Sequence, residues 1–443
     1  MKEKIKAKTK GKINHSHASW HSLFIAARYL IGKGNKGSRY LLGAAGGIAL
    51  SMIPIMVTLI VSDGMIRGIT DRFLELGTGH LQVWPYRVTQ NQDLEAQMQD
   101  AKETILAIDN IRQVWEEKQG LGIIIAADGK TGTTIRAVDP SFWEDTGSVK
   151  YLSVIKGEAL LKNDTDVLLG EELAKSIGAE VGKPLRIMTV RNTSLGKSIP
   201  MVTAFTVRGI VSSGYHEMDS MWCFVSLNAG EKIFQVNNCY TYLVIKINDP
   251  YKYANYAAND IDANLDGAFG VYTWKDLQRS QYSSYESTRQ LLLLIMALIV
   301  LVASVNVSSA TSMLVIERRR DIAVLKSFGA SVKDIKNIFM WGSFLTGIAG
   351  AVPGIAAGLL IGCNINQIIH GVEHGINLFT ALLDKQEVRI LDPGFYLEQI
   401  PIVIDVKTVV SIGVFTLLCS VAASLFPAMR AARTKPIELI RKY

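Results

Sequence analysis

The chain has 443 residues, of which 49% are hydrophobic and 20% are charged, and its formal net charge is +7. These values are the average expected when a membrane-embedded part is joined to a soluble part. They do not indicate a nucleic-acid-binding protein, because the basic residues lie beside long apolar runs, where they suit an anionic lipid surface. Four cysteines are too few for a disulfide-stapled scaffold.

Four stretches of the chain contain no Asp, Glu, Lys or Arg. They are residues 41–62, 290–316, 337–372 and 408–429. An uncharged apolar run of about 20 residues predicts a helix that crosses a membrane. We therefore expect four transmembrane helices, at 41–62, 290–316, 337–366 and 408–429.

The segments between these stretches alternate in net charge. The charges are +9 for 1–40, −6 for 63–289, +3 for 317–336, −3 for 373–407 and +4 for 430–443. Because Lys and Arg stay on the cytoplasmic side of a membrane, the pattern orients the chain. It predicts a multi-pass protein of the bacterial inner membrane, with both termini in the cytoplasm and with 63–289 and the loop 367–407 outside.

Residues 1–40 form a basic tail, which we expect to lie on the lipid surface and to include an amphipathic helix over 23–40. The first span is too long for the apolar part of a signal peptide, and no small-residue cleavage site follows it. Its small residues would let another helix approach closely. They are Gly43, Ala44, Ala45, Gly46, Gly47, Ala49 and Ser51. That helix belongs either to the same bundle or to a second subunit or substrate, and both alternatives stay open.

The outer segment alternates between strand-like and helix-like patterns. Strands are expected at 80–84, 121–127, 132–138, 222–226, 240–247 and 269–273, and helices at 92–108, 228–235 and 250–263. This order predicts a large α+β extracytoplasmic domain between the first two spans. Residues 63–139 and 226–273 would form one α+β subdomain, interrupted by a β-rich insertion over 140–225.

Two details of the outer segment bear on function. A polar loop, 191–200, separates the strands expected near 181–188 and 203–211, and it should be exposed. Cys223 and Cys239 lie on the oxidising side, either as a disulfide or as two thiols.

Residues 274–316 contain neither Pro nor Gly. They predict one helix of about 60 Å, at 1.5 Å per residue. Only its second half fits within the lipid, so residues 274–289 would stand out as a stalk. A continuous helix of this kind can carry a movement from the membrane to the outer domain.

The second cytoplasmic segment, 317–336, is amphipathic over Glu317 to Leu325, and Gly329 is positioned to end the helix. Its chemistry-bearing residues are Glu317, Arg318, Arg319, Arg320, Asp321, Lys326, Gly329 and Ala330. A short charged helix between two spans is either a knob for a cytosolic partner or a loop that contacts lipid heads.

The stretch from Glu317 to Ala330 resembles the coupling-helix signature of the MacB/FtsX superfamily of ABC transporter permeases, E-[KR]-[RT]-x-[ED]-I-[AG]-x-[LM]-[KR]-x-[LFI]-G-A. The C-terminal run from Phe426 to Arg441 is similar to the terminus of that superfamily. Within it, residues 395–402 and 78–83 are most like the lipoprotein-releasing (LolC/LolE-type) permeases.

This resemblance implies a chain without ATPase activity or cofactor of its own. ATP and Mg²⁺ would be bound by a separate cytosolic ATPase dimer that grips residues 317–330. The other implied partners are a second permease subunit (a second copy or a related chain), a periplasmic lipoprotein carrier, a lipoprotein substrate and membrane lipids.

The resemblance also assigns two further sites. Loop residues Arg191, Asn192, Thr193, Ser194, Leu195, Gly196, Lys197, Ser198, Ile199 and Pro200 are similar in placement to a carrier-binding hook. Met52, Ile55, Met56 and Leu294 would line a substrate cavity. A MacB-type efflux permease and an FtsX-like, non-transporting regulator of a cell-wall hydrolase are the alternative functions.

Two short motifs invite an enzymatic interpretation that the sequence does not support. The Gly-Lys-Thr at 129–131 and the Gly-Lys-Ser at 196–198 lack the first glycine of a phosphate-binding loop, since positions 124 and 191 hold Ile and Arg. Residues 370–374 fit the zinc motif H-x-x-E-H. They follow an apolar run without a third ligand nearby, so we expect no metal there.

Overall fold

The computed structural model of the chain describes residues 23–28, 36–86, 91–192, 198–234, 239–265, 267–381, 397 and 399–433. The chain divides into two compact units. The helical unit combines Met1–Gly64, Ser287–Ile368 and Ile402–Tyr443. The sheet unit combines Met65–Glu286 and Ile369–Pro401.

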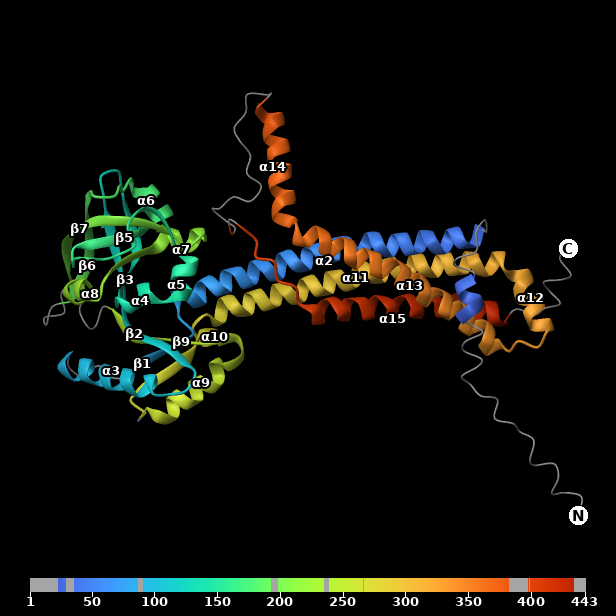
Figure 1. The fold of residues 1–443 in the computed structure, drawn as a ribbon, viewed down its shortest axis with the longest axis horizontal. Coiled ribbons are helices and arrows are strands. Elements are labelled where there is room, and N and C mark those ends of the chain that lie inside the picture. The colour runs from blue at the N-terminus through green and yellow to red at the C-terminus, as the bar shows by residue number, and fades with distance from the viewer. Residues whose placement is uncertain are drawn as a thin grey trace, which may run out of the picture. The chain divides into compact units, whose positions relative to one another are not determined.

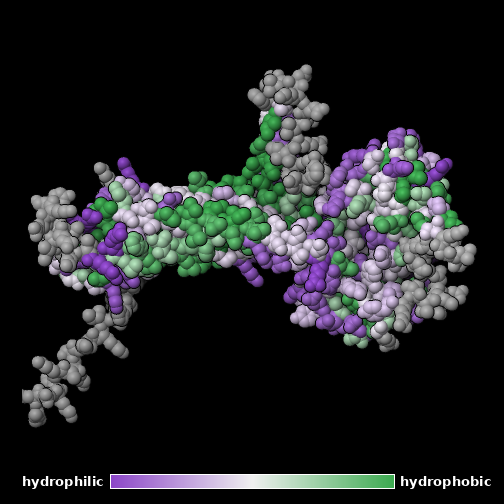
Figure 2. Space-filling view, turned by 180° about the vertical axis from the view of Figure 1, so that it is seen from behind, coloured by the Kyte–Doolittle hydropathy of each residue, from purple (hydrophilic) through white to green (hydrophobic). Residues whose placement is uncertain are grey.

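The helical unit contains four long apolar helices, labelled in Figure 1: α2 (Lys36–Arg72), α11 (Arg279–Glu317), α13 (Val332–Cys363) and α15 (Val406–Arg433). Each is long and apolar enough to cross a membrane. This confirms the prediction of four apolar helices. Figure 2 shows hydrophobic residues gathered on the surface of these helices, whereas hydrophilic residues prevail on the sheet unit.

Three helices differ from the sequence predictions. α2 does not end near residue 62 but runs to Arg72, and the π-helix η1 (Phe73–Gly77) follows it directly. The single helix predicted over 274–316 is wrong at its start, because Gln278 has non-helical backbone angles and separates α10 (Trp274–Leu277) from α11. The predicted loop 367–407 begins as helix α14 (Ile365–Ala381), in which apolar residues recur at helical spacing.

Glycines at every fourth position of α13 bring α2 close to it. A Cβ atom on Gly350 would lie 2.5 Å from the Ala45 carbonyl oxygen, and one on Gly354 would lie 2.7 Å from that of Ala49. Such spacing lets two helix backbones approach closely. One face of the first span therefore packs inside the bundle, whereas Gly43 and Gly46 are exposed on another face.

The sheet unit begins with an open layer of strands in the order β10-β1-β9-β2. Its strands are β1 (Leu81–Pro85), β2 (Ile111–Ile125), β9 (Tyr240–Ile247) and β10 (Phe269–Thr273). Helices α3 (Asn91–Leu106) and α9 (Pro250–Asn264) contribute Met98, Ile105 and Ile261 to one buried core with these strands. This layer and its two helices have the α+β composition expected of the outer domain.

Five further strands and β2 close into a ring of hydrogen-bonded pairs, and β4 (Ser153–Gly157) pairs with β7 outside the ring. β2 pairs with β3 (Lys130–Val138), β3 with β8 (Trp222–Ser226), β8 with β5 (Asp166–Gly170), β5 with β7 (Ser198–Ser212), β7 with β6 (Pro184–Asn192), and β6 again with β2. A closed ring has no exposed strand edges. Its interior holds Ile135, Leu169, Ile187 and Phe205, with Ile177 of α6 (Glu171–Ile177) and Ile233 of α8 (Leu227–Ile233).

The long strand β2 joins the two parts. Its first half pairs with β9 in the open layer, and its second half pairs with β3 and β6 in the ring. The predicted boundary at residue 139 is therefore displaced, because β3 and half of β2 belong to the ring. The short elements α4 (Ser141–Glu144), α5 (Thr146–Tyr151), β4 (Ser153–Gly157) and α7 (His216–Met221) lie between ring strands in the chain.

Candidate functional site

The predicted coupling segment forms the short helix α12 (Arg319–Ser327). The chain leaves the helical conformation at Arg318, whose side chain pairs with Asp321 at 3.0 Å. Gly329 has a φ of +93°, a conformation that suits glycine, and it ends the segment as predicted. Ser331 and Asp334 then form a capping box that starts α13.

One face of α12 is buried and the other is presented outward. Ile322 and Ala323 pack into a core with Phe339 of α13 and Ala431 of α15, and Ala330 packs beside them. The predicted residues Glu317, Arg319, Arg320 and Gly329 are exposed. Phe328, which is not among the predicted site residues, is 88% exposed.

Phe328 changes the character of this surface. An exposed aromatic side chain is costly in isolation and is typical of a protein interface, where Phe and Arg are enriched. Its signal in the sequence was an apolar residue on the polar side of an amphipathic segment. Val324, 54% exposed, carries the same signal.

Lys326 connects α12 to the last helix. Its Nζ donates a hydrogen bond of 2.6 Å to the Ala432 carbonyl, one residue before the end of α15 at Arg433. A cation at this position satisfies an orphan carbonyl and the negative end of the helix dipole. α12 is thus fixed to the end of α15 as well as to α13.

The four predicted cavity residues differ in how far they are buried. Met52, Ile55 and Met56 are buried in the bundle core, where Met52 contacts Gly354 and Met56 contacts Gly358. Leu294 of α11 is 58% exposed. A substrate cavity lined by all four stays a prediction.

Three charged residues meet where the charge-free runs begin or end. Arg289 of α11 pairs with Asp63 of α2 at 3.0 Å and with Asp405 at 3.5 Å. Asp405 also accepts the Thr408 hydroxyl in the first turn of α15. The cluster ties three membrane helices at one level. In the sequence, Asp63 and Arg289 mark only the limits of charge-free runs.

The predicted carrier-binding loop is the tip of the β6–β7 hairpin. The strands extend further than predicted, because Arg191 pairs with Ile199 and Asn192 pairs with Ser198. Residues 193–197 lie outside the described residues. Ser198, Ile199 and Pro200 are exposed.

An apolar sheet face adjoins this tip. Ile123 of β2, Met188 of β6 and Val202 of β7 are partners in successive strands and project from the same face of the ring. Leu121 is 79% exposed, and Val190 and Val202 are each about half exposed. Exposed apolar residues therefore share one face of these strands beside the hairpin tip.

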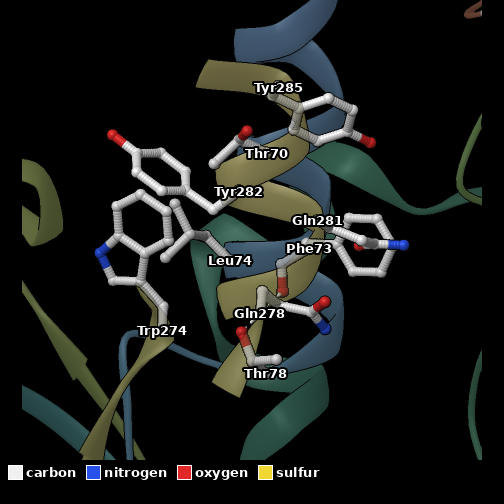
Figure 3. A pocket seen from close by; sticks show the side chains of 9 residues that line it. All are labelled: Thr70, Phe73, Leu74, Thr78, Trp274, Gln278, Gln281, Tyr282 and Tyr285. Carbon is white, nitrogen blue, oxygen red and sulfur yellow. Dashed lines mark hydrogen bonds between the residues drawn. The ribbon is translucent and has the colours of Figure 1, made fainter. Parts of the chain in front are cut away.

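A small pocket lies between the end of α2 and the start of α11, within the sheet unit (Figure 3). Trp274 packs edge-on against Tyr282 at 5.3 Å. The lining residues are Thr70, Phe73, Leu74, Thr78, Trp274, Gln278, Gln281, Tyr282 and Tyr285. The pocket is therefore lined by the end of α2, by η1 and by the start of α11, all within the sheet unit.

The remaining sequence candidates have simple surroundings. Cys223 is buried in the ring, Cys239 is partly buried, and both are free thiols. His370 pairs with Glu373 at 3.4 Å on α14. Within the part of the chain that the structure describes, no three His, Cys, Asp or Glu side chains are grouped as metal ligands.

Comparison with known families follows the two parts of the chain. Residues 41–259 match the MacB-like periplasmic core domain, and residues 293–436 match the FtsX-like permease C-terminal domain. The first match includes most of α2 and most of the sheet unit. The second includes most of α11, α12, α13 and α15.

Whole-chain relatives share a name. The chain is 26% identical to the lipoprotein-releasing system transmembrane protein LolC of Neisseria meningitidis, over 94% of this chain and 98% of the relative. It is 28% identical to LolC of Xylella fastidiosa, over 95% and 98%. It is 22% identical to LolE of Haemophilus influenzae, over 95% and 99%.

Proposed function

Because this chain belongs to the MacB/FtsX superfamily of ABC transporter permeases, we propose that it is the permease subunit of a lipoprotein-releasing transporter in the bacterial inner membrane. The observation that carries the proposal is the similarity to LolC and LolE over nearly the full length of the chain. The transporter would take lipoproteins from the outer leaflet of that membrane and pass them to a soluble periplasmic carrier.

The energy source in this proposal is a separate cytosolic ATPase dimer, which binds ATP and Mg²⁺. Arg319 on α12 is exposed, and so are Phe328 and Gly329, which follow the helix directly. These exposed residues support the role of α12 as a contact site for such a dimer. Closure of the ATPase on ATP would draw together the α12 helices of two permease subunits. The second subunit is a second copy or a related chain.

The substrate class explains why ATP is needed. Moving acyl chains out of a bilayer costs about 0.8 kcal/mol for each methylene that loses its apolar surroundings. The carrier must therefore bind the acyl chains before they become exposed to water. The exposed apolar face of β2, β6 and β7, beside the hairpin tip at 193–197, supports a carrier-binding role for this surface.

Reconstitution tests the function directly. The chain would be co-expressed with candidate ATPase and permease partners, inserted into proteoliposomes with a triacylated lipoprotein, and mixed with ATP and purified carrier. Transfer of the lipoprotein to the soluble fraction, dependent on both ATP and carrier, is the expected result. No transfer, together with ATP-dependent loss of a small amphipathic substrate, would instead favour a MacB-type efflux permease, to which the core-domain match also corresponds.

A further inference from the structure

The first membrane helix ends inside the sheet unit, at the π-helix η1. Backbone carbonyls in the last turn of any helix have no partner within the helix. Here Lys246 of β9 supplies one. Its Nζ donates to the Leu74 carbonyl at 2.9 Å and to the Glu75 carbonyl at 2.8 Å.

A second buried cation holds the next two carbonyls. The Arg136 guanidinium, from β3, donates to the Leu76 carbonyl and, at 3.3 Å, to the Gly77 carbonyl. Gln82 of β1 donates to the carbonyl of Thr78 at 2.9 Å. Five consecutive carbonyls at the helix end are therefore held by side chains of three different strands.

Each cation is paired with a carboxylate, which is fully buried in Glu117 and partly buried in Glu75. Lys246 lies 2.7 Å from the Glu75 carboxylate, and its side chain has no exposed surface. Arg136 makes a two-pronged pair with Glu117, at 2.6 Å and 2.9 Å. The Arg136 guanidinium also lies over the ring of Trp222, at 4.7 Å from its centroid.

Stability alone does not account for this arrangement. Apolar residues of similar volume often replace a buried ion pair at no cost in stability, because the charges must first leave water. Apolar packing, however, does not fix the orientation of a helix end, because it is not directional. Hydrogen bonds from two fixed cations to successive carbonyls hold the position and the rotation of a helix end, and cations also suit the negative end of its dipole.

We propose that Lys246 and Arg136 are positioning residues that fasten the first membrane helix to the outer sheet, so that a movement of the helix moves the sheet with it. The inference rests on the proposed function, in which ATP binding in the cytoplasm drives work outside. Chain continuity supports it, because α2 runs without a break from Lys36 to Arg72 and η1 follows at once.

The test replaces one cation together with its counter-charge, so that no lone charge is buried. In Lys246→Met/Glu75→Gln, amide hydrogen exchange at 74–79 should rise at least about tenfold, as expected for lost hydrogen bonds from a charged donor. Exchange in the ring strands should stay unchanged. ATP hydrolysis should stay near normal. The difference in amide hydrogen exchange of the sheet unit with and without ATP should disappear. The amount of lipoprotein released per ATP hydrolysed should fall about tenfold or more.

The matched control is Lys118→Met/Glu231→Gln, which removes a Lys–Glu pair of 2.8 Å at the surface of the same unit. It should leave all four measurements unchanged. Should the first variant fail to fold, Arg136→Lys keeps the charge but loses the two-pronged geometry, and it is scored in the same way.

Two results would overturn the inference. One is unchanged exchange at 74–79. The other is faster exchange there with an intact nucleotide response in the sheet unit. If the natural chain releases no lipoprotein, the proposed function fails. The exchange measurements, which need no lipoprotein, still decide whether the two cations fasten the helix.

Discussion

At the scale of single residues, His80 shows how the sheet unit fixes a proton. Its Nδ1 accepts the backbone N–H of Ile247 at 2.9 Å, so Nε2 carries the proton and faces the Glu75 carboxylate at 3.1 Å. Burial lowers the pKa of His80, and the Lys246 cation lowers it further, although the Glu75 carboxylate opposes both. The imidazole is therefore held neutral in the folded chain.

The pH dependence of stability follows from the lowered pKa of His80. Between the lowered pKa of His80 and about 6.5, the unfolded chain binds more protons than the folded one, so stability falls as the pH drops. We expect the sheet unit to lose up to about 1.4 kcal/mol per pH unit in that window. Urea unfolding at pH 7.5, 6.5 and 5.5, followed by tryptophan fluorescence, measures it. His80→Gln should flatten the dependence, and an equally steep dependence in that variant would exclude His80 as its source.

Phe328 is the residue on which we expect ATPase binding to depend most. Loss of an exposed aromatic anchor at an interface costs about 2 kcal/mol or more, which is roughly a thirtyfold weaker affinity. Phe328→Ala, and separately Arg319→Glu/Arg320→Glu, should reduce co-purification of the ATPase while leaving membrane insertion intact. Phe415→Ala in α15 is the matched control. Normal co-purification and normal ATPase stimulation in both α12 variants would place the contact elsewhere.

At the scale of elements, two glycines of α13 allow the effect of helix packing to be measured apart from the effect of helix propensity. Gly354 and Gly342 lie in the same helix, and Ala is the better helix former at both positions. A Cβ on Gly354 would meet the Ala49 backbone at 2.7 Å and 2.8 Å, whereas one on Gly342 meets nothing within 4 Å. The same substitution should therefore have opposite effects.

We expect Gly354→Ala to destabilise the helical unit by about 1–3 kcal/mol, because α2 must move away. Gly342→Ala should be neutral or stabilising by up to about 1 kcal/mol. Thermal unfolding in one detergent compares the two variants. Equal midpoints would show that α2 and α13 are not in close contact in the protein.

The β6–β7 hairpin permits a clean excision. Asn192 and Ser198 are cross-strand partners, so replacing 193–197 by Asn-Gly keeps the register with a two-residue turn. Stability and basal ATP hydrolysis should stay near normal, while transfer to the soluble carrier is lost. Transfer at the natural rate would mean that the carrier binds elsewhere, or that the partner subunit binds it.

At the scale of the whole molecule, the alternating charge of the segments predicts on which side of the membrane each part of the chain lies. The sheet unit should lie outside the membrane and α12 inside. Burial raises the pKa of Cys223 to about 12, so this thiol should not react. The other three cysteines can be replaced.

In that background, an impermeant maleimide should label Leu121→Cys in cells with a permeable outer envelope. Ser327→Cys should need lysis, since both positions are exposed but lie on opposite sides of the membrane in this topology. The reverse pattern would invert the orientation of the chain and remove the basis for an ATPase contact at α12.

The sequence by itself determined the features that depend on local pattern. Charge-free runs fix where helices are long and apolar, and alternation with turn residues placed most strands of the sheet unit, such as 240–247 and 269–273. The coupling helix was also local, since an amphipathic segment ended by Gly329 needs no tertiary information.

Tertiary structure alone decided the rest, because it depends on which distant strands pair. Nothing in the pattern of residues 111–125 shows that one strand serves both the open layer and the closed ring. Lys246 and Arg136 read as ordinary strand cations until β9 and β3 bring them to the end of a helix formed some 60 to 170 residues earlier in the chain. Burial then turns common charges into specific contacts, since a buried cation must find its acceptors wherever the fold presents them.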